Sequence, residues 1–326
     1  MTTDETLTTT TSLTISPTKK LLRGTGWILT FLVFFAIFTA LKLPDGKVGA
    51  LLLEKASKAI SSPERRIELT ADKTHLPWFI LGTLRFEGLK ATTTSADGVP
   101  MTIRWKDLSI SPSFFSLFLG RLGGTIQVSG AKSGSIEASF YTSRGGKFSF
   151  ESRIKSADLG ADGLGLLPLL TGLAIKLPVD GQISLEGSFE DTASLTGDLE
   201  LALGKTELQA QKISGFPIPA IRIQDGNVKI TIANGSATLK TFRLGNMNQG
   251  VDDLAGSATG TISIGKPIEF SQLNVSTRFK LSEAVIKGLF IIDAILAPGK
   301  EPDGSYHLSL QGPMTALQML PGKETL

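Results

Sequence analysis

Apolar and polar side chains alternate along most of this chain, which is the pattern of β-strands that bury one face. In the segment LTGDLELAL, Leu199, Leu201 and Leu203 alternate with Asp198 and Glu200, so the leucines share one face and the carboxylates the other. This alternation predicts strands at 66–70, 80–90, 101–110, 124–129, 134–142, 147–154, 182–189, 195–203, 205–212, 219–224, 227–232, 236–243, 255–264, 271–281 and 305–311. We therefore predict a mainly β protein.

Strands with one apolar face belong to antiparallel sheets that are wet on one side. Asn234-Gly235 stands between two alternating runs, where it strongly favours a hairpin turn. Each buried Leu, Ile or Phe contributes about 1.5–3 kcal/mol, so an apolar face built by so many strands cannot remain in water. We expect an elongated, curved, largely antiparallel sheet. Three solutions stay open for its apolar face, because the sheet can close on itself, pack against partner proteins, or form a trough that holds acyl chains.

Three segments depart from strand periodicity. Residues 47–60 have apolar positions at helical spacing and predict an amphipathic helix against the membrane or the sheet. Residues 162–175 and 282–299 are apolar on most sides and predict two short apolar helices, which are buried or interfacial. Each of these two is followed by a Pro, an Asp-Gly and a strand ending in L-x-G, which indicates duplicated units around 160–280 and 282–320.

One stretch near the start is long enough to cross a membrane. Residues 24–41 form an uncharged run of 18 residues, which makes roughly 27 Å of helix. The expected anchor residues are Trp27, Ile28, Leu29, Phe31, Leu32, Val33, Phe34, Phe35, Ile37 and Phe38. A cleaved signal peptide is the alternative, but no A-x-A site follows the run. A buried core helix is the other alternative.

The anchor divides the chain into expected parts. We expect a disordered cytoplasmic tail at 1–18, the transmembrane anchor at 19–43, a membrane-proximal helical linker at 44–65 and a β-repeat domain at 66–326. Basic residues flank the anchor on both sides, so charge alone does not fix its orientation. We adopt the usual arrangement of a signal anchor, with a short tail inside and the large domain outside.

Composition and motifs argue against nucleic-acid binding and against a catalytic or metal site. The chain has a net charge of +3 and no basic cluster with interleaved aromatics, so nucleic acid is not an expected partner. It has no Cys, two His and neither a G-x-S-x-G nor a Walker motif. We expect His307 on the polar strand face in solvent, and Asp252 and Asp253 as solvated turn charges. No catalytic residue, cofactor or metal is therefore expected, and the protein is predicted not to be an enzyme.

The predicted functional feature is a surface. The apolar positions of two central strands and of the second apolar helix are its candidate residues: Ile183, Leu185, Phe189, Leu199, Leu201, Leu203, Phe290, Ile291 and Ile295.

The order of these segments resembles a known family. A short basic N-terminus, one span, LKLPDGKV, the connector LLPLLTGLAIKLPVDGQISLEGSF, residues 254–283 and the closing DGSYHLSLQGPM are similar to the type II secretion system protein N (GspN) family and, distantly, to AsmA-like proteins. The resemblance covers most of residues 20–320 and is one of spacing and glycine placement. It implies a bacterial inner-membrane protein, single-pass, with its C-terminal domain in the periplasm.

Two functions follow as expectations. The first is a non-enzymatic component of the type II protein secretion system that acts through its β-sheet surface, with other secretion subunits as partners. The second is an AsmA-like lipid-binding or lipid-transfer protein that carries acyl chains in an apolar groove, with membrane lipids as partners. An envelope hydrolase lacks a supporting motif, and the oligomeric state stays open.

Overall fold

The large sheet is an antiparallel meander. In the computed structural model, the structure describes residues 45–61, 66–75, 82–94, 100–113, 116, 120–132, 134–143, 145–160, 162–171, 173–188, 190–213, 216–246, 250–266, 270–289 and 295–322. These residues form a mainly β structure with few helices. The 15-stranded sheet contains β1 (Glu68–Thr70), β2 (Lys73–His75), β3 (Leu84–Thr94), β4 (Pro100–Pro112), β5 (Arg121–Gly130), β6 (Ser135–Ser143), β7 (Lys147–Asp158), β9 (Pro178–Ser188), β10 (Thr196–Leu203), β15 (Gly226–Ala233), β16 (Ser236–Leu244), β17 (Leu254–Ser263), β18 (Gln272–Leu281), β19 (Tyr306–Pro313) and β20 (Gln318–Pro321).

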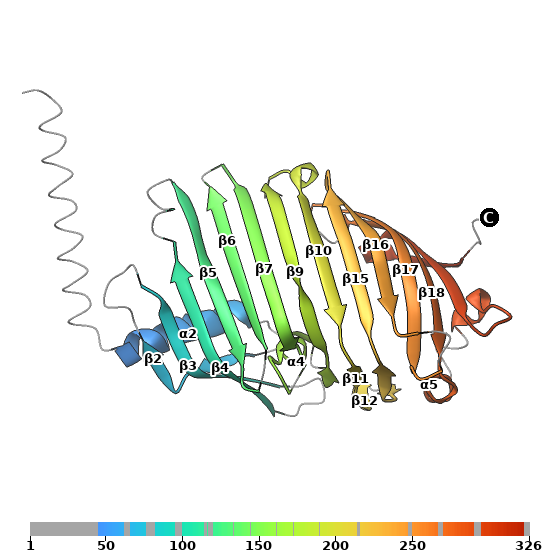
Figure 1. Ribbon diagram of the computed structural model, residues 1–326, viewed down its shortest axis with the longest axis horizontal. Helices are drawn as coiled ribbons and strands as arrows, with labels where there is room; N and C mark the ends of the chain where they lie inside the picture. Colours follow the sequence, from blue (N-terminus) through green and yellow to red (C-terminus); the bar gives the residue numbers. More distant parts are fainter. Residues whose placement is uncertain are drawn as a thin grey trace, which may run out of the picture. The chain divides into compact units, whose positions relative to one another are not determined.

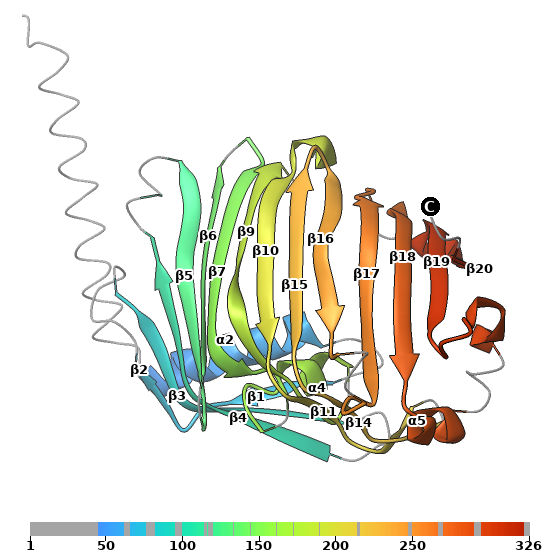
Figure 2. The ribbon, with the colours of Figure 1, turned by 45° about the vertical axis from the view of Figure 1, so that its right-hand side comes forward.

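From β3 to β20, each strand of this sheet lies beside the sheet strand that follows it in sequence (Figures 1 and 2). The order runs β1-β3-β4-β5-β6-β7-β9-β10-β15-β16-β17-β18-β19-β20, and β2 pairs with β3. Among the described strands, β1 and β2 pair only with β3, and β20 pairs only with β19. The sheet built by these residues is therefore open at both ends. Of the three possibilities given above for the apolar face, this excludes a sheet that closes on itself.

Smaller elements are inserted in three of the connections. Helix α4 (Leu166–Thr171) and β8 (Ile175–Lys176) separate β7 from β9. Strands β11 (Thr206–Leu208), β12 (Gln211–Ile213), β13 (Phe216–Ile218) and β14 (Ile221–Ile223) separate β10 from β15 and build two small sheets, β14-β11-β8 and β12-β13. Helix α5 (Glu283–Gly288) and the 3-10 turn η3 (Ala297–Gly299) separate β18 from β19. Two further 3-10 turns are η1 (Thr192–Ser194) and η4 (Met314–Ala316).

The main core lies at the first end of the sheet. Helix α2 (Asp45–Ile60) contributes Leu53, α4 contributes Leu169, and β3 and β4 contribute Phe86 and Trp105 to one buried cluster. The Trp105 indole Nε1 donates a hydrogen bond of 2.7 Å to the Leu164 carbonyl, so the segment before α4 is fixed over β4. A smaller core cluster of Leu296, Tyr306 and Leu308 lies toward the other end of the sheet. The rings of Tyr306 and Phe279 stack there with their centroids 5.4 Å apart.

Most of the predicted strands are confirmed, with differences at the edges and in the insertions. The predicted strands at 205–212 and 219–224 are confirmed only as the short strands β11, β12 and β14, which belong to the small sheets and not to the large sheet. Strands β2 and β20 were not predicted, since three or four residues are too short to show a period. The Asn234-Gly235 hairpin is confirmed, with φ of 52° and 69° as a type I′ turn requires.

Each of the three predicted helical segments contains a helix, but the two apolar helices are shorter than predicted: α4 covers six residues of 162–175, which ends in β8, and α5 covers six residues of 282–299. Helix α2 covers the amphipathic segment, and α5 begins after Ser282, whose hydroxyl accepts from the Val285 amide as an N-cap. Helix α4 is only six residues long. The expected anchor at 24–41 lies outside the described residues, and none of the helices inside them is long and apolar enough to cross a bilayer.

Candidate functional site: the apolar face of the sheet

Strand pairing aligns one residue from each of thirteen strands in a single row, and eleven of these residues have apolar side chains. Residues directly opposite each other in an antiparallel pair point to the same face, so consecutive pairings trace a row across the sheet. This central row consists of Leu84, Ile110, Ile126, Ala138, Ser152, Ile183, Leu199, Ile230, Leu239, Gly260, Val275, Leu310 and Met319. Ser152 is its one polar member, and it is buried.

Two further rows flank the central row on the same face. The first contains Phe86, Leu108, Val128, Ile136, Ile154, Gly181, Leu201, Val228 and Phe242. The second contains Gly124, Phe140, Phe150, Leu185, Gly197, Ile232, Ala237, Ile262 and Leu273. We call the three rows together the apolar face, and none of its members carries a charge.

The apolar face is only partly covered by the described residues. At the first end, Phe86 and Ile154 are buried in the main core together with Leu53 of α2 and Leu169 of α4. In the middle strands, Ile183 and Leu199 remain half-buried, and Phe140 is 40% exposed. A contiguous apolar surface that keeps contact with water retains a driving force for binding something apolar.

The opposite face of the same strands is polar and paired. Arg85 Nε on β3 lies 2.8 Å from Asp107 Oδ1 on β4, and Lys229 Nζ on β15 lies 3.6 Å from Glu200 Oε1 on β10. Thr231 donates a hydrogen bond of 2.9 Å to Asp198. These cross-strand pairs satisfy one another in solvent, so the sheet has one wet face and one apolar face.

The structure brings five of the predicted surface residues together. Ile183, Leu185, Leu199, Leu201 and Leu203 lie on the same face of β9 and β10, with Leu199 opposite Ile183. Phe189, Phe290 and Ile291 lie outside the described residues.

The remaining predicted residue, Ile295, is not brought to that face. It lies in the helical turn before η3, where it is 61% exposed, and its neighbour Leu296 packs on Tyr306 instead. Sequence reasoning also missed the residues that the outer strands contribute to the central row, such as Leu84 on β3 and Met319 on β20. Their alignment depends on the pairing register, although the alternation within β3 gave a signal.

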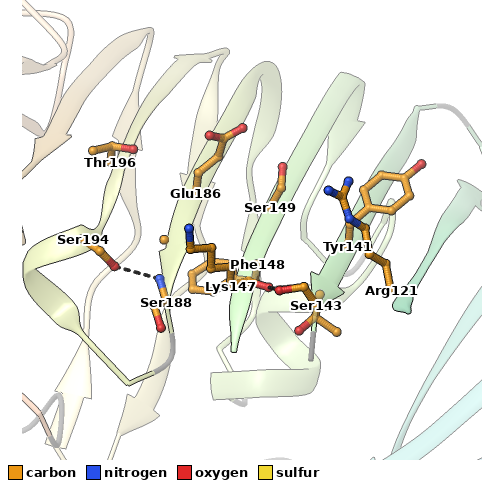
Figure 3. A pocket seen from close by; sticks show the side chains of 12 residues that line it. Arg121, Tyr141, Ser143, Lys147, Phe148, Ser149, Glu186, Ser188, Ser194 and Thr196 are labelled. Atoms are coloured by element: carbon orange, nitrogen blue, oxygen red, sulfur yellow. Dashed lines mark hydrogen bonds between the residues drawn. The ribbon is translucent and has the colours of Figure 1, made fainter. Parts of the chain in front are cut away.

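A depression on the polar face is the second candidate (Figure 3). It has a volume of about 440 Å³ and lies at the ends of β5, β6, β7, β9 and β10. Tyr141, Ser149, Glu186 and Thr196 form a row across it, one position away from the apolar row. Arg121 and Tyr141 lie at one end, and Ser188 and Ser194 lie at the other. The charged side chains here are exposed, as on an ordinary wet surface.

A hydroxyl–imidazole–carboxylate group is the third candidate. Ser276 Oγ lies 2.9 Å from His307 Nε2, and His307 Nδ1 lies 3.5 Å from Glu301 Oε1. The prediction of a solvated His307 is therefore wrong in part, because the imidazole is on the polar face but is packed against Glu301. A nucleophilic serine also needs donors for an oxyanion. Ser276 sits in the middle of β18, whose backbone is paired with β17 and β19 on both sides, so we assign the group to strand packing.

The position of Asp253 differs from the prediction made for it. It is 9% exposed and is not a solvated turn charge. Its carboxylate accepts 3.0 Å hydrogen bonds from the Arg222 backbone N and side-chain Nε, and one of 3.1 Å from the Ser282 hydroxyl. Burial by itself would raise the pKa of Asp253, but these hydrogen bonds outweigh it and hold the pKa below its ordinary value. The sequence Asp-Asp before a strand carried no signal of these distant partners.

Comparison with known proteins gives no relative for this chain. No family model, curated protein or solved structure matches it. The described residues also contain no group of three or more His, Asp or Glu side chains that could hold a metal ion. The fold and site thus define only a class, an open antiparallel sheet with one charge-free apolar face. The resemblance to the GspN family stays a prediction.

Proposed function

We propose that the protein binds lipid acyl chains along its apolar face. One observation carries the proposal: a charge-free central row that crosses thirteen strands, with Ser152 as its one polar member, and in which Ile183, Leu199 and Ile230 stay half-buried. Such a ligand has few requirements, since an acyl chain needs apolar contact and no hydrogen-bond partner. Burial of each of its CH₂ groups contributes about 0.8 kcal/mol.

The dimensions of the apolar face suit this ligand. Thirteen strands spaced about 4.8 Å apart give a row roughly 58 Å long, and three alternating positions on a strand give a width of roughly 14 Å. The part of this length that is open to a ligand lies beyond the first end, which α2 and the segment around α4 cover. One leaflet of a bilayer holds acyl chains within about 15 Å, which is half of its hydrocarbon thickness. The apolar face therefore has room for several chains side by side.

The proposed setting of this activity follows from the sequence. An inner-membrane anchor with the sheet in the periplasm would place the apolar face where lipids are available. A role in the type II secretion system would use the same surface for a protein partner, and it stays a second prediction that the same experiment separates from lipid binding.

Photo-crosslinking at neighbouring positions tests the proposal in the full chain. A photoreactive amino acid is placed at Ile183, Leu199 or Ile230 on the apolar face. The matched controls are Gln182, Glu200 and Lys229, which are the adjacent positions on the polar face. After irradiation in cells, adducts are identified by mass spectrometry.

We expect lipid adducts at the three apolar positions and none above background at the three polar ones. Equal lipid adducts on both faces, or none on either, contradict the proposal. Protein adducts restricted to the apolar positions contradict it as well and favour the secretion-partner function.

A further inference from the structure

Helix α2 is fixed against the sheet by one of its faces. Leu53 points into the main core, and a Cβ on Gly49 would clash with the Thr74 side chain, so the helix lies in close contact with β2. The Ser57 hydroxyl accepts from the Leu69 amide at 2.9 Å, and the Ser61 hydroxyl accepts from the Ile67 amide at 2.9 Å. These contacts determine which side of α2 faces away from the sheet.

The outward side of α2 combines lysines with exposed leucines. Lys47, Leu51, Lys55 and Lys58 are spaced by four, four and three residues and form one stripe along the helix. Leu51 is 53% exposed, and Leu52 beside it is 39% exposed. One carboxylate borders the stripe, that of Glu54, which pairs with Lys58 at 2.7 Å.

This combination is typical of helices that lie in a membrane interface. The leucines can enter the boundary between headgroups and acyl chains while the lysine stems extend to the phosphates. Each lysine near an anionic bilayer surface strengthens the attraction roughly five-fold. In a helix that faced only water, the two leucines would gain nothing from their position.

The chain that precedes α2 supplies an independent argument. The uncharged run at 24–41 ends four residues before Asp45, the first residue of α2. Four Cα–Cα steps span at most about 14 Å, and the headgroup layer of one leaflet is itself about 5–7 Å thick. If the run spans the bilayer, α2 must begin at the membrane surface.

We propose that the outward side of α2, formed by Lys47, Leu51, Leu52, Lys55 and Lys58, lies on a bilayer surface that carries anionic phosphate headgroups. This contact places the first end of the large sheet next to the membrane. At that end, β1 and β2 pack on α2. The proposal does not depend on acyl-chain binding by the apolar face.

The absence of cysteine from the sequence allows a direct test in the full chain. The variants Leu52→Cys and Lys55→Cys are labelled with an environment-sensitive fluorophore and reconstituted in vesicles of equal parts phosphatidylcholine and phosphatidylglycerol. Lys240→Cys, an exposed position on β16, is the control. Lipids with spin labels near the headgroup quench the fluorophores that touch the interface.

We expect several-fold stronger quenching at positions 52 and 55 than at position 240. The added substitutions Lys47→Gln and Lys58→Gln are expected to reduce this quenching, and so is replacing the vesicles by pure phosphatidylcholine. Circular dichroism melting of each variant shows that the fold is kept.

Quenching at 52 and 55 no stronger than at 240 overturns the proposal. Strong quenching that is the same on both vesicle types overturns its anionic part. Neither result bears on the lipid adducts at positions 183 and 199, so failure here is distinguishable from failure of the proposed function.

Discussion

Asp253 connects three elements through a single carboxylate. It precedes β17, accepts hydrogen bonds from Arg222 on β14, and accepts from Ser282, the N-cap of α5. Its backbone N–H also donates to the Arg222 carbonyl at 2.9 Å. The small sheet and α5 are therefore attached to the large sheet at one residue.

Replacement of this carboxylate is expected to destabilise the fold. Asp253→Ala leaves the Arg222 amide and the Ser282 hydroxyl without their acceptor, which costs about 2–3 kcal/mol. Asp252→Ala is a useful comparison, because Asp252 accepts from the Gln224 and Asn246 amides but is less buried. Urea unfolding of the three proteins measures the difference, and an unchanged midpoint for Asp253→Ala would contradict the assignment.

The lowered pKa of Asp253 predicts a direction for pH dependence. The carboxylate is more acidic in the folded state than its ordinary value of about 3.9, so its stabilisation is complete above that value. It is lost as the pH falls through the lower, folded-state pKa. We expect the stability gap between the natural chain and Asp253→Asn to shrink between pH 5 and pH 2, measured by thermal unfolding at each pH.

Substitutions at two adjacent residues of β10 are expected to destabilise the fold to very different degrees. Leu201 packs against the main core, so Leu201→Asp places an unpaired charge on the apolar face and costs roughly 3 kcal/mol or more. Glu200 lies on the polar face in an exposed pair with Lys229, so Glu200→Lys costs at most about 1 kcal/mol. Melting temperatures that fall equally in both variants would contradict the faces assigned here.

At the scale of elements, the approach of α2 to β2 depends on a glycine. Alanine normally stabilises a helix interior relative to glycine by about 1 kcal/mol. At Gly49 the added methyl group meets three atoms of Thr74, so Gly49→Ala is expected to destabilise by about 1–3 kcal/mol instead. The control Gly145→Ala has open space around its new methyl group. A gain in melting temperature for Gly49→Ala would show that α2 adapts its position.

The elements differ in how far the sequence predicts them. Long hairpin strands such as β9 and β10 alternate over several residues, so their position and apolar face follow from period alone. The short strands of the connection between β10 and β15 share that alternation but pair in separate small sheets, because pairing partners are a tertiary property. The edge strand β20 has neither length nor alternation, and only the ladder with β19 reveals it.

For the whole molecule, the apolar face could be expected but its extent could not. The sequence offers Ile183 and Leu199 as candidates, yet the row from Leu84 to Met319 exists only through the register of twelve successive pairings. Whether such a face is closed or open depends on which strands form the edges. That information lies in long-range pairing and not in local pattern.

Occupancy of the apolar face is expected to change the stability of the whole sheet. A ligand that binds only the folded state adds about 2.7 kcal/mol when its concentration is 100 times its dissociation constant. The full chain stripped of lipid in a mild detergent should therefore melt at a lower temperature than the same chain after phospholipid is added back. Differential scanning calorimetry measures the shift. An identical melting temperature in both states would contradict lipid binding by the folded protein.

The meander order of the large sheet has a consequence for how such proteins change in size. Because β15, β16, β17 and β18 each pair with the next strand in sequence, one hairpin can be duplicated or deleted without rerouting the remainder of the chain. Each added hairpin lengthens the sheet by about 9.6 Å, and the two-strand step keeps the direction of every later strand. A chain with more or fewer such hairpins would then differ in the length of its sheet while keeping the same cross-section.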